Sequence, residues 1–261
     1  MCEVTVVTTA GRPDDESLAL ARAACDALGA AFEPRKKRSV AKIADSLQAN
    51  VIVAGKNRYE YYKKGAAAPF FFHPNSAAFR LKRVARGEQE PLLTACDLHT
   101  GDSFLDCTLG IGSDSMLAAF AVGKSGRVVG LEANKNIAFI VARGMQVYDT
   151  SELPLTAVMR GIEVVHSEAL HYLRTQPDNS FDVVYMDPMF EEVIAEATNF
   201  EALREAGSHI ALDAEWVAEA KRVARRRVVL KAHFESQWFA QYDFVQDRRQ
   251  TAKFHYGVWQ K

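Results

Sequence analysis

The pattern of apolar and polar residues changes near residue 100 of this 261-residue chain. From Phe104 onward, short β-branched and apolar runs alternate with longer stretches whose apolar residues recur at helical spacing. Strands that alternate with helices indicate crossover connections and therefore a mostly parallel sheet. The predicted strands lie at 103–107, 128–132, 163–166, 182–186 and 227–231, and the predicted helices at 114–122, 137–148, 169–174 and 213–224.

The C-terminal segment departs from this alternation. Strands are predicted at 242–245 and 254–259, and no helical pattern lies between them. Two consecutive strands of this kind typically pair as an antiparallel hairpin. We therefore expect an α/β fold whose mostly parallel sheet ends in a C-terminal antiparallel hairpin.

The first 75 residues predict a small α/β lobe of their own. We expect two domains, with this lobe at 1–75 and a domain that contains a helical lead-in and the main sheet at 76–261. Ser39 is the predicted cap of the second helix. The elements predicted before residue 100 are strands at 4–8, 51–54, 59–62 and 69–72 and helices at 15–28, 40–47, 76–86 and 91–98.

A glycine turn follows the first strand of the main sheet. The segment reads Leu105-Asp106-Cys107-Thr108-Leu109-Gly110-Ile111-Gly112, and a helix is predicted directly after it. Glycines let the backbone approach a ligand closely, and the helix N-terminus supplies free N–H donors. The third glycine of the dinucleotide motif is missing, which disfavours a nicotinamide oxidoreductase. The candidate cofactor residues in this segment are Asp106, Thr108, Gly110, Gly112 and Asp114.

Acids at the ends of the next two strands extend this pattern. Glu132 follows Gly112 by about 20 residues, where an acid is placed to hydrogen-bond ribose hydroxyls. Glu168 lies just beyond the third strand and can accept a hydrogen bond from an adenine amino group. Either acid alone could simply begin a helix. Together with the glycine turn they predict an adenosine-bearing cofactor, with Ala133 and Ala169 beside them as further candidates.

The segment Asp187-Pro188-Met189-Phe190 follows the fourth strand and resembles the D/N-P-P-Y/F motif of amino-group methyltransferases. An exocyclic amine on a base is a poor nucleophile because its lone pair is delocalised into the ring. Asp187 and the backbone carbonyl of Pro188 can each accept a hydrogen bond from such an amine and direct its lone pair. Phe190 can stack on the base. An Asp-Pro pair can also be an ordinary turn, but its place after a buried strand favours catalysis.

Three segments of the chain resemble one enzyme family. The stretches 106–112, 184–190 and 223–231 are similar to the bacterial small-subunit ribosomal RNA guanine-N2 methyltransferase J family, and the resemblance covers roughly Arg80 to the C-terminus. It implies a Rossmann-like class I methyltransferase sheet, S-adenosyl-L-methionine as cofactor, and methyl transfer to N2 of a guanine in 16S ribosomal RNA. By this resemblance the cofactor positions are Asp106, Gly110, Gly112 and Glu132, and the substrate positions are Asp187 and Phe190.

The net charge of −1 gives no global field that would attract RNA, so a local patch must bind it. Lys and Arg bind phosphates, and aromatic rings stack on splayed bases. The candidates for RNA contact are Arg80 and Arg83 on the helix at 76–86, and Lys63 and Lys64 in a loop. Charge runs are also commonly solvated faces that bind nothing.

Other functions stay open on the residues alone. The enzyme could methylate another amine, in DNA, in a protein side chain or in a small molecule. A domain that binds S-adenosylmethionine or RNA without catalysis is a further possibility. Asp187 and Phe190 speak against it, because they retain the residue types that the chemistry needs.

Neither a metal site nor a membrane segment is expected. The four cysteines are widely spaced without a C-x-x-C pair, and the histidines lack ligand spacing. The apolar stretches are too short to span a bilayer, and the N-terminus lacks the regions of a signal peptide. We expect a cytoplasmic protein with reduced thiols. The sequence makes no prediction of the oligomeric state.

Overall fold

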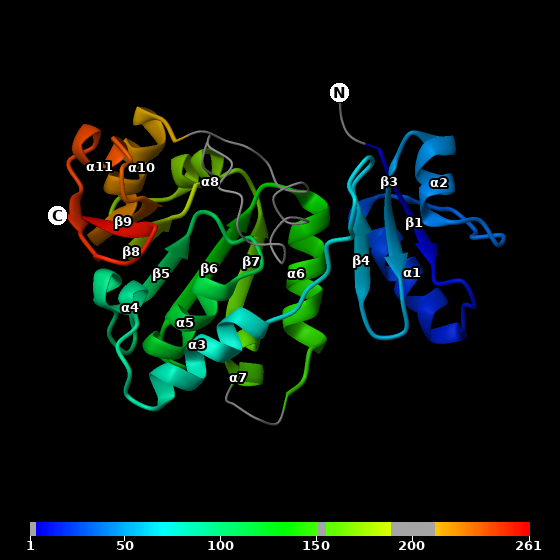
Figure 1. Cartoon of the computed structure of the whole chain (residues 1–261), viewed down its shortest axis with the longest axis horizontal. Helices are drawn as coiled ribbons and strands as arrows, with labels where there is room; N and C mark the ends of the chain where they lie inside the picture. The colour runs from blue at the N-terminus through cyan, green and yellow to red at the C-terminus, as the bar shows by residue number, and fades with distance from the viewer. Residues whose placement is uncertain (1–3, 151–154, 189–211) are drawn as a thin grey trace. The chain divides into compact units, whose positions relative to one another are not determined.

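The computed structural model describes residues 4–150, 155–188 and 212–261. Contacts divide the described chain into two compact units (Figure 1), which are considered separately below. Because the units are not continuous in sequence, the predicted domain boundary at residue 75 stays a prediction. The described parts of the first unit are 4–73 and 134–144, and those of the second are 74–133, 145–150, 155–188 and 212–261.

The first unit contains a small α/β sheet. Its elements are β1 (Thr5–Thr9), α1 (Asp15–Leu28), β2 (Ala31–Phe32), α2 (Val40–Leu47), β3 (Asn50–Ala54) and β4 (Tyr59–Tyr62). Among the described residues the strand order is β2-β1-β3-β4, with β4 antiparallel to β3 and the other pairs parallel. Both helices match their predicted bounds. Ser39 caps α2 as expected, by accepting a hydrogen bond from the N–H of Lys42.

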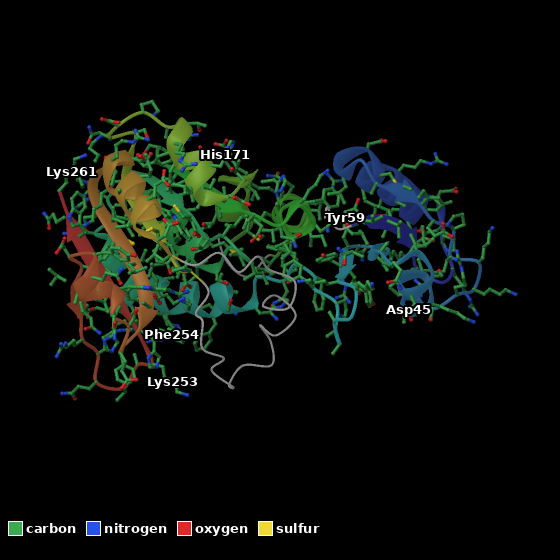
Figure 2. The ribbon with its side chains drawn as sticks, turned by 90° about the horizontal axis from the view of Figure 1, so that it is seen from above. Asp45, Tyr59, His171, Lys253, Phe254 and Lys261 are labelled. Atoms are coloured by element: carbon green, nitrogen blue, oxygen red, sulfur yellow. The ribbon has the colours of Figure 1, made fainter. Side chains whose placement is uncertain are left out.

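Aromatic residues of this unit belong to its core. Tyr59, labelled in Figure 2, packs edge-to-face on Phe139 with ring centroids 4.9 Å apart, and its hydroxyl donates to the carbonyl of Leu20. Tyr61 and Phe70 are buried and form the isolated bridge that joins the two predicted aromatic strands. These rings stabilise the lobe and do not form an exposed platform for bases.

The second unit contains the main sheet. Its strands are β5 (Ser103–Asp106), β6 (Arg127–Glu132), β7 (Ile162–His166), β8 (Phe181–Met186), β9 (Ala224–His233), β10 (Val245–Asp247) and β11 (Phe254–Gln260). In the described chain these form one sheet with the order β10-β11-β9-β8-β5-β6-β7. The strands from β9 to β7 in that order pair in parallel, whereas β11 is antiparallel to both β9 and β10. The predicted fold class is confirmed.

The strand predicted at 242–245 lies instead at Val245–Asp247. Tyr242 ends a short helix, α11 (Trp238–Gln241), and Phe244 is a buried core residue, so the strand begins only at Val245. The predicted antiparallel pairing with the last strand is nevertheless correct.

Helices cover both faces of the main sheet. They are α3 (Asn75–Ala85), α4 (Pro91–Cys96), α5 (Ser113–Val122), α7 (Leu155–Arg160), α8 (Ala169–Thr175), α10 (Ala214–Val223) and α11, while α6 (Lys135–Val147) is divided between the two units. In Figure 1, α8 and α10 lie on one face of the sheet, and α3, α4 and α5 lie on the other. Right-handed crossovers between parallel strands produce this two-faced arrangement.

The strand order reverses direction between β5 and β8. The chain continues from β5 toward β6 and β7, whereas from β8 it continues toward β9 and β11. In open α/β sheets, ligands bind at such a switch point, outside the carboxyl ends of the strands. Asp106 ends β5, and Asp187 directly follows β8, so the topology brings both predicted motifs to this position.

Candidate active site

The glycine turn has the backbone geometry that its residues predict. Gly110 and Gly112 adopt positive φ angles of 51° and 79°. A Cβ atom at Gly112 would lie 2.2 Å from the terminal methyl carbon of Met145, so a side chain there would be strained and crowded. Gly112 caps α5 without a side-chain acceptor, so no N-cap side chain satisfies the first-turn N–H groups of this helix.

Asp106 lies beneath this turn. Its carboxylate accepts hydrogen bonds from the backbone N–H of Thr108 at 2.9 Å and from the hydroxyl of Ser115 at 2.7 Å. Burial raises the pKa of Asp106 to about 7. The carboxyl group therefore ties the glycine turn to α5. Its assignment to the cofactor stays a prediction, and so does that of Thr108.

The next two strand ends lie along the same edge of the sheet. Glu132 is buried at the end of β6, beside His166 of β7, and its carbonyl accepts a hydrogen bond from the N–H of Ser167. Ala133 follows it and is half-buried, whereas Glu168 is exposed at the N-cap of α8. Ala169 is buried as the first residue of that helix.

This edge fits an adenosine-bearing cofactor. It combines a turn where a backbone can approach closely, an acid at the second strand end and an exposed acid after the third. The two acids can accept hydrogen bonds from the hydroxyl groups of ribose and the amino group of adenine. The assignments of Gly110, Gly112, Glu132, Glu168 and their neighbours to that ligand remain predictions.

Asp187 and Pro188 lie beside the glycine turn. The backbone N–H of Asp187 donates to the hydroxyl of Thr108 at 2.8 Å, and the N–H of Cys107 donates to the carbonyl of Tyr185. Pro188 is buried. The predicted stacking residue Phe190 lies outside the described residues. The described half of the predicted catalytic motif is thus hydrogen-bonded directly to the proposed cofactor turn.

Lys231 is a site residue that the sequence reasoning missed. Its Nζ lies 2.6 Å from Oδ2 of Asp187 and 3.6 Å from Oδ2 of Asp114. Burial alone would lower the pKa of Lys231, but the two carboxylates raise it well above its ordinary value. Both carboxylates therefore favour the charged form of Lys231.

Asp114 connects this lysine to a wider network of charges. Its Oδ2 accepts a hydrogen bond from the hydroxyl of Tyr185 at 2.7 Å, and its Oδ1 accepts from Arg80. Burial would raise the pKa of Asp114, but Lys231 and Arg80 hold it well below its ordinary range. Arg80 also forms a two-pronged contact with Glu90. Asp114 was predicted to bind the cofactor, and its described contacts are with these protein groups.

Arg80 was predicted to contact RNA, and that role stays a prediction. Its side chain is only 23% exposed, and its guanidinium is engaged by Glu90 and Asp114. Arg80 therefore joins α3 to α4 and α5 instead of presenting free donors. The other three predicted RNA contacts sit differently: Arg83 is exposed and paired with Glu88, Lys63 is half-buried, and Lys64 is exposed with its ammonium donating to Gln48.

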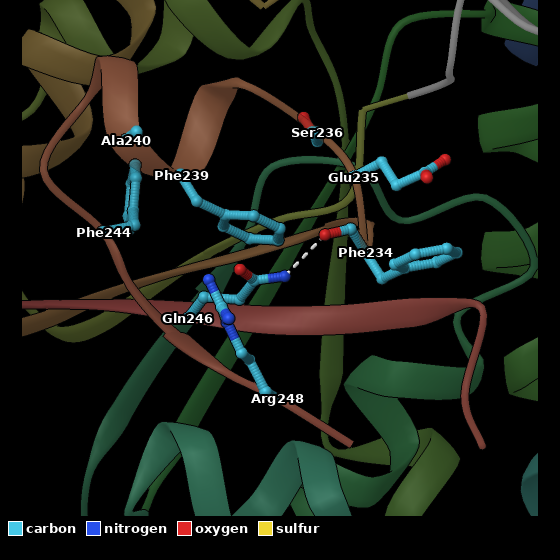
Figure 3. Close-up of a pocket in the computed structure, with 8 residues that line it drawn as sticks. All are labelled: Phe234, Glu235, Ser236, Phe239, Ala240, Phe244, Gln246 and Arg248. Carbon is cyan, nitrogen blue, oxygen red and sulfur yellow. Dashed lines mark hydrogen bonds between the residues drawn. The ribbon is translucent and has the colours of Figure 1, made fainter. Parts of the chain in front are cut away.

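A hollow of about 480 Å³ opens beyond the carboxyl end of β9 (Figure 3). The amide of Gln246 donates to the carbonyl of Phe234 at 2.7 Å across one side of it. None of the predicted cofactor residues lines the hollow, so it is separate from the glycine turn. Its lining residues are Phe234, Glu235, Ser236, Phe239, Ala240, Phe244, Gln246 and Arg248.

Two further expectations concern metals and thiols. Within residues 4–150, 155–188 and 212–261, no group of three or more His, Cys, Asp or Glu side chains could hold a metal ion. Cys25, Cys96 and Cys107 are free, and burial raises the pKa of Cys107 well above its ordinary value, so it is an inert core residue. No helix of the described chain is long and apolar enough to cross a membrane.

Comparisons with known proteins show which proteins this chain resembles. Over 255 residues, 98% of this chain and 99% of the other, the protein is 42% identical to "Uncharacterized protein YpiP" of Bacillus subtilis. It is 30% identical to ribosomal RNA small subunit methyltransferase J of Acinetobacter baylyi over 115 residues, 43% of this chain and 41% of that protein. The chain thus matches less than half the length of that relative.

A similar solved structure extends the comparison of the fold. It is the SAM-dependent methyltransferase NGO1261 from Neisseria gonorrhoeae, with a TM-score of 0.59 and 17% identity over 97% of this chain and 95% of that one. The SAM_MT family model, described as "Putative SAM-dependent methyltransferase", matches residues 37–260. The chain therefore belongs to this family of methyltransferases, which use S-adenosylmethionine (SAM) as their cofactor.

Proposed function

We propose that this protein transfers a methyl group from SAM to the exocyclic N2 of a guanine in 16S ribosomal RNA. The partial similarity to ribosomal RNA small subunit methyltransferase J supports the choice of RNA. The acceptor atom is inferred from the Asp187-Pro188 motif, whose oxygens suit an amine that must donate hydrogen bonds. A cytoplasmic location, where ribosomal RNA is found, is part of the proposal.

One observation carries this proposal. Asp187 follows a strand at the switch point of the sheet. Its backbone N–H donates a hydrogen bond to the hydroxyl of Thr108, in the glycine turn, at 2.8 Å. Its side chain is 25% exposed. A hydrogen-bond acceptor beside the methyl donor is what a planar amine requires, whereas a carboxylate substrate would be repelled by it.

SAM supplies an electrophilic methyl group when it is bound. Gly110 and Gly112 would let the turn approach the cofactor, Glu132 would hold its ribose, and Glu168 would receive its adenine amino group. The remaining residues proposed to contact it are Asp106, Thr108, Asp114, Ala133, Ala169 and Asp187.

On the substrate side, Asp187 would accept one hydrogen bond from the guanine amino group, and the carbonyl of Pro188 would accept a second. These bonds draw the nitrogen lone pair out of conjugation with the ring and orient it. Phe190 would stack on the base after it leaves its RNA helix. Orientation of the nucleophile supplies much of the rate enhancement in such a site.

Transfer of tritiated methyl groups tests the proposal. The protein is incubated with labelled SAM and 16S ribosomal RNA from cells that lack it, and the RNA is then digested to nucleosides. Label in N2-methylguanosine supports the proposal. Label in another nucleoside, or none in RNA while S-adenosylhomocysteine still binds, would contradict it and favour another amine acceptor or a binding module.

A further inference from the structure

Lys231 contacts the proposed catalytic carboxylate directly. We infer that Lys231 is a positioning residue for methyl transfer, whose ammonium group holds Oδ2 of Asp187 and leaves Oδ1 of the same carboxylate for the acceptor amine. The inference rests on the proposed function, because that function gives Asp187 its reacting partner. It adds a residue from β9 to a site otherwise formed after β5 and β8.

The contact is built into the sheet. Met186 and Leu230 are register partners on parallel strands, so the residues that follow them, Asp187 and Lys231, are neighbours at the carboxyl edge. The Nζ–Oδ2 distance is 2.6 Å, and each of the two side chains is 25% exposed. A partly buried, charge-assisted hydrogen bond of this length fixes both groups far better than a surface ion pair does.

Lys231 is itself held from a second side. Oδ2 of Asp114 lies 3.6 Å from its Nζ, and Asp114 is fixed in turn by Tyr185 and Arg80. Among the hydrogen bonds of the described residues, Lys231 engages Oδ2 of Asp187 and none engages Oδ1, so the two carboxylate oxygens differ in their protein contacts. A carboxylate held through one oxygen is pre-organised to accept a hydrogen bond from the substrate amine through the other.

The surrounding charges explain why a cation is needed here. Burial raises the pKa of Asp187, and Lys231 opposes that effect. Without the lysine, the nearby carboxylate of Asp114 would favour protonation of Asp187 still more. A protonated carboxyl is a poorer acceptor for the amine. Among the described residues, the titratable groups that act on Asp187 or feel its charge include Lys231 on β9, Asp114 on α5, Arg80 on α3, Tyr185 on β8, Tyr256 on β11 and Asp106 on β5.

The sign of the pH effect follows from this arrangement. The active form has Asp187 ionised, so activity is lost as pH falls through the pKa of Asp187. Replacing Lys231 by methionine removes the charge with little change in side-chain volume, and it should move this loss to higher pH. Lys231→Arg keeps the charge, so its activity should fall at the same acidic pH as that of the wild type.

A titration that needs no substrate tests the pairing first. The side-chain carboxyl ¹³C signal of Asp187 is assigned by its absence from Asp187→Asn and is followed against pH in each variant. In Lys231→Met its midpoint should rise by about one to three pH units. An unchanged midpoint in a variant that still folds would overturn the inference and leave the proposed function intact.

The rate of methyl transfer to 16S ribosomal RNA against pH tests the positioning role. At neutral pH, kcat of Lys231→Met should fall by about tenfold or more, and much of the loss should be recovered at alkaline pH. Lys221→Met is the matched control, since Lys221 has a similar exposure of 21% but sits on α10, paired with Asp243. An equal loss at every pH would indicate a merely structural role and would contradict the inference.

Wild-type activity separates the two hypotheses. A wild-type enzyme that labels no guanine would refute the proposed function, whatever the titration shows. A wild-type enzyme that labels N2 of guanine, together with a Lys231→Met variant whose pH profile is unaltered, would refute only the role of Lys231.

Discussion

Two aspartates at neighbouring strand ends have different surroundings. Asp106 is buried beneath the glycine turn and is bonded to Thr108 and Ser115, whereas Asp187 keeps 25% of its side chain exposed and meets Lys231. The first carboxyl group is suited to shaping the turn. The second is suited to touching a substrate.

Asp187→Ala should still bind S-adenosylhomocysteine, because the other proposed cofactor contacts lie in the glycine turn and at the ends of β6 and β7. It should lose methyl transfer by about a hundredfold or more, because an acceptor directed at the reacting amine is removed. Calorimetric titration and the tritium assay measure the two properties. Asp45→Ala, on an exposed position of α2 that Figure 2 labels, is the control. Full activity of Asp187→Ala would show that the proposed mechanism is wrong.

Asp106 should make stability depend on pH. Because burial raises its pKa from 3.8 to about 7, the folded state holds a proton in this interval that the unfolded state has released. The free energy of unfolding contributed by this group is therefore present at low pH and falls as pH rises from about 4 to about 7.

Asparagine cannot ionise, so Asp106→Asn should gain stability relative to the wild type as pH rises through that interval. Urea unfolding of both proteins at several pH values measures the difference, with the exposed Asp243→Asn as the control. A difference that stays constant with pH would contradict the raised pKa.

At the scale of elements, α3 is fixed to the core by one arginine and carries a second arginine on its surface. Arg80 bridges Glu90 and Asp114, whose side chains are 9% and 13% exposed. Arg83 pairs with Glu88, and both of these side chains are more than 40% exposed. The helix thus carries two arginines three residues apart, one in a partly buried ion-pair network and the other in an exposed ion pair.

Arg80→Met should lower the free energy of unfolding by about 3–5 kcal/mol, because it leaves Glu90 without its cation and Asp114 with Lys231 alone. Arg83→Met should change it by about 0–1 kcal/mol, since solvent screens an exposed pair. Denaturant unfolding of the two variants provides the comparison. Similar losses in both would mean that the Arg80 network contributes little.

The bounds of long elements follow from local signals. α1 and α2 have their predicted limits because Asp14 and Ser39 cap them with hydrogen bonds that sequence alone suggests. Short elements were missed: β2, α7 and α11 have too few residues for a periodic pattern. At 242–245 the apolar pattern resembled a strand, but Phe244 is apolar because it is buried in the core and Tyr242 ends α11.

At the scale of the whole molecule, strand-end motifs predicted the fold and the family, since each motif has a required place on a parallel sheet. Interactions that depend on strand register could not be predicted. Lys231 lies next to Asp187 only because β8 and β9 are adjacent with Met186 opposite Leu230. Glu90 gave no signal, and neither did the grouping of 134–144 with the first unit, because both arise from tertiary contacts.

The most direct test of the central claim is the N2-methylguanosine content of 16S ribosomal RNA, measured by mass spectrometry of nucleosides from cells with and without this protein. We predict that deletion removes N2-methylation at one guanine, that the wild-type gene restores it, and that Asp187→Ala does not. An unchanged N2-methylguanosine content after deletion would contradict the account and would direct the search to another amine.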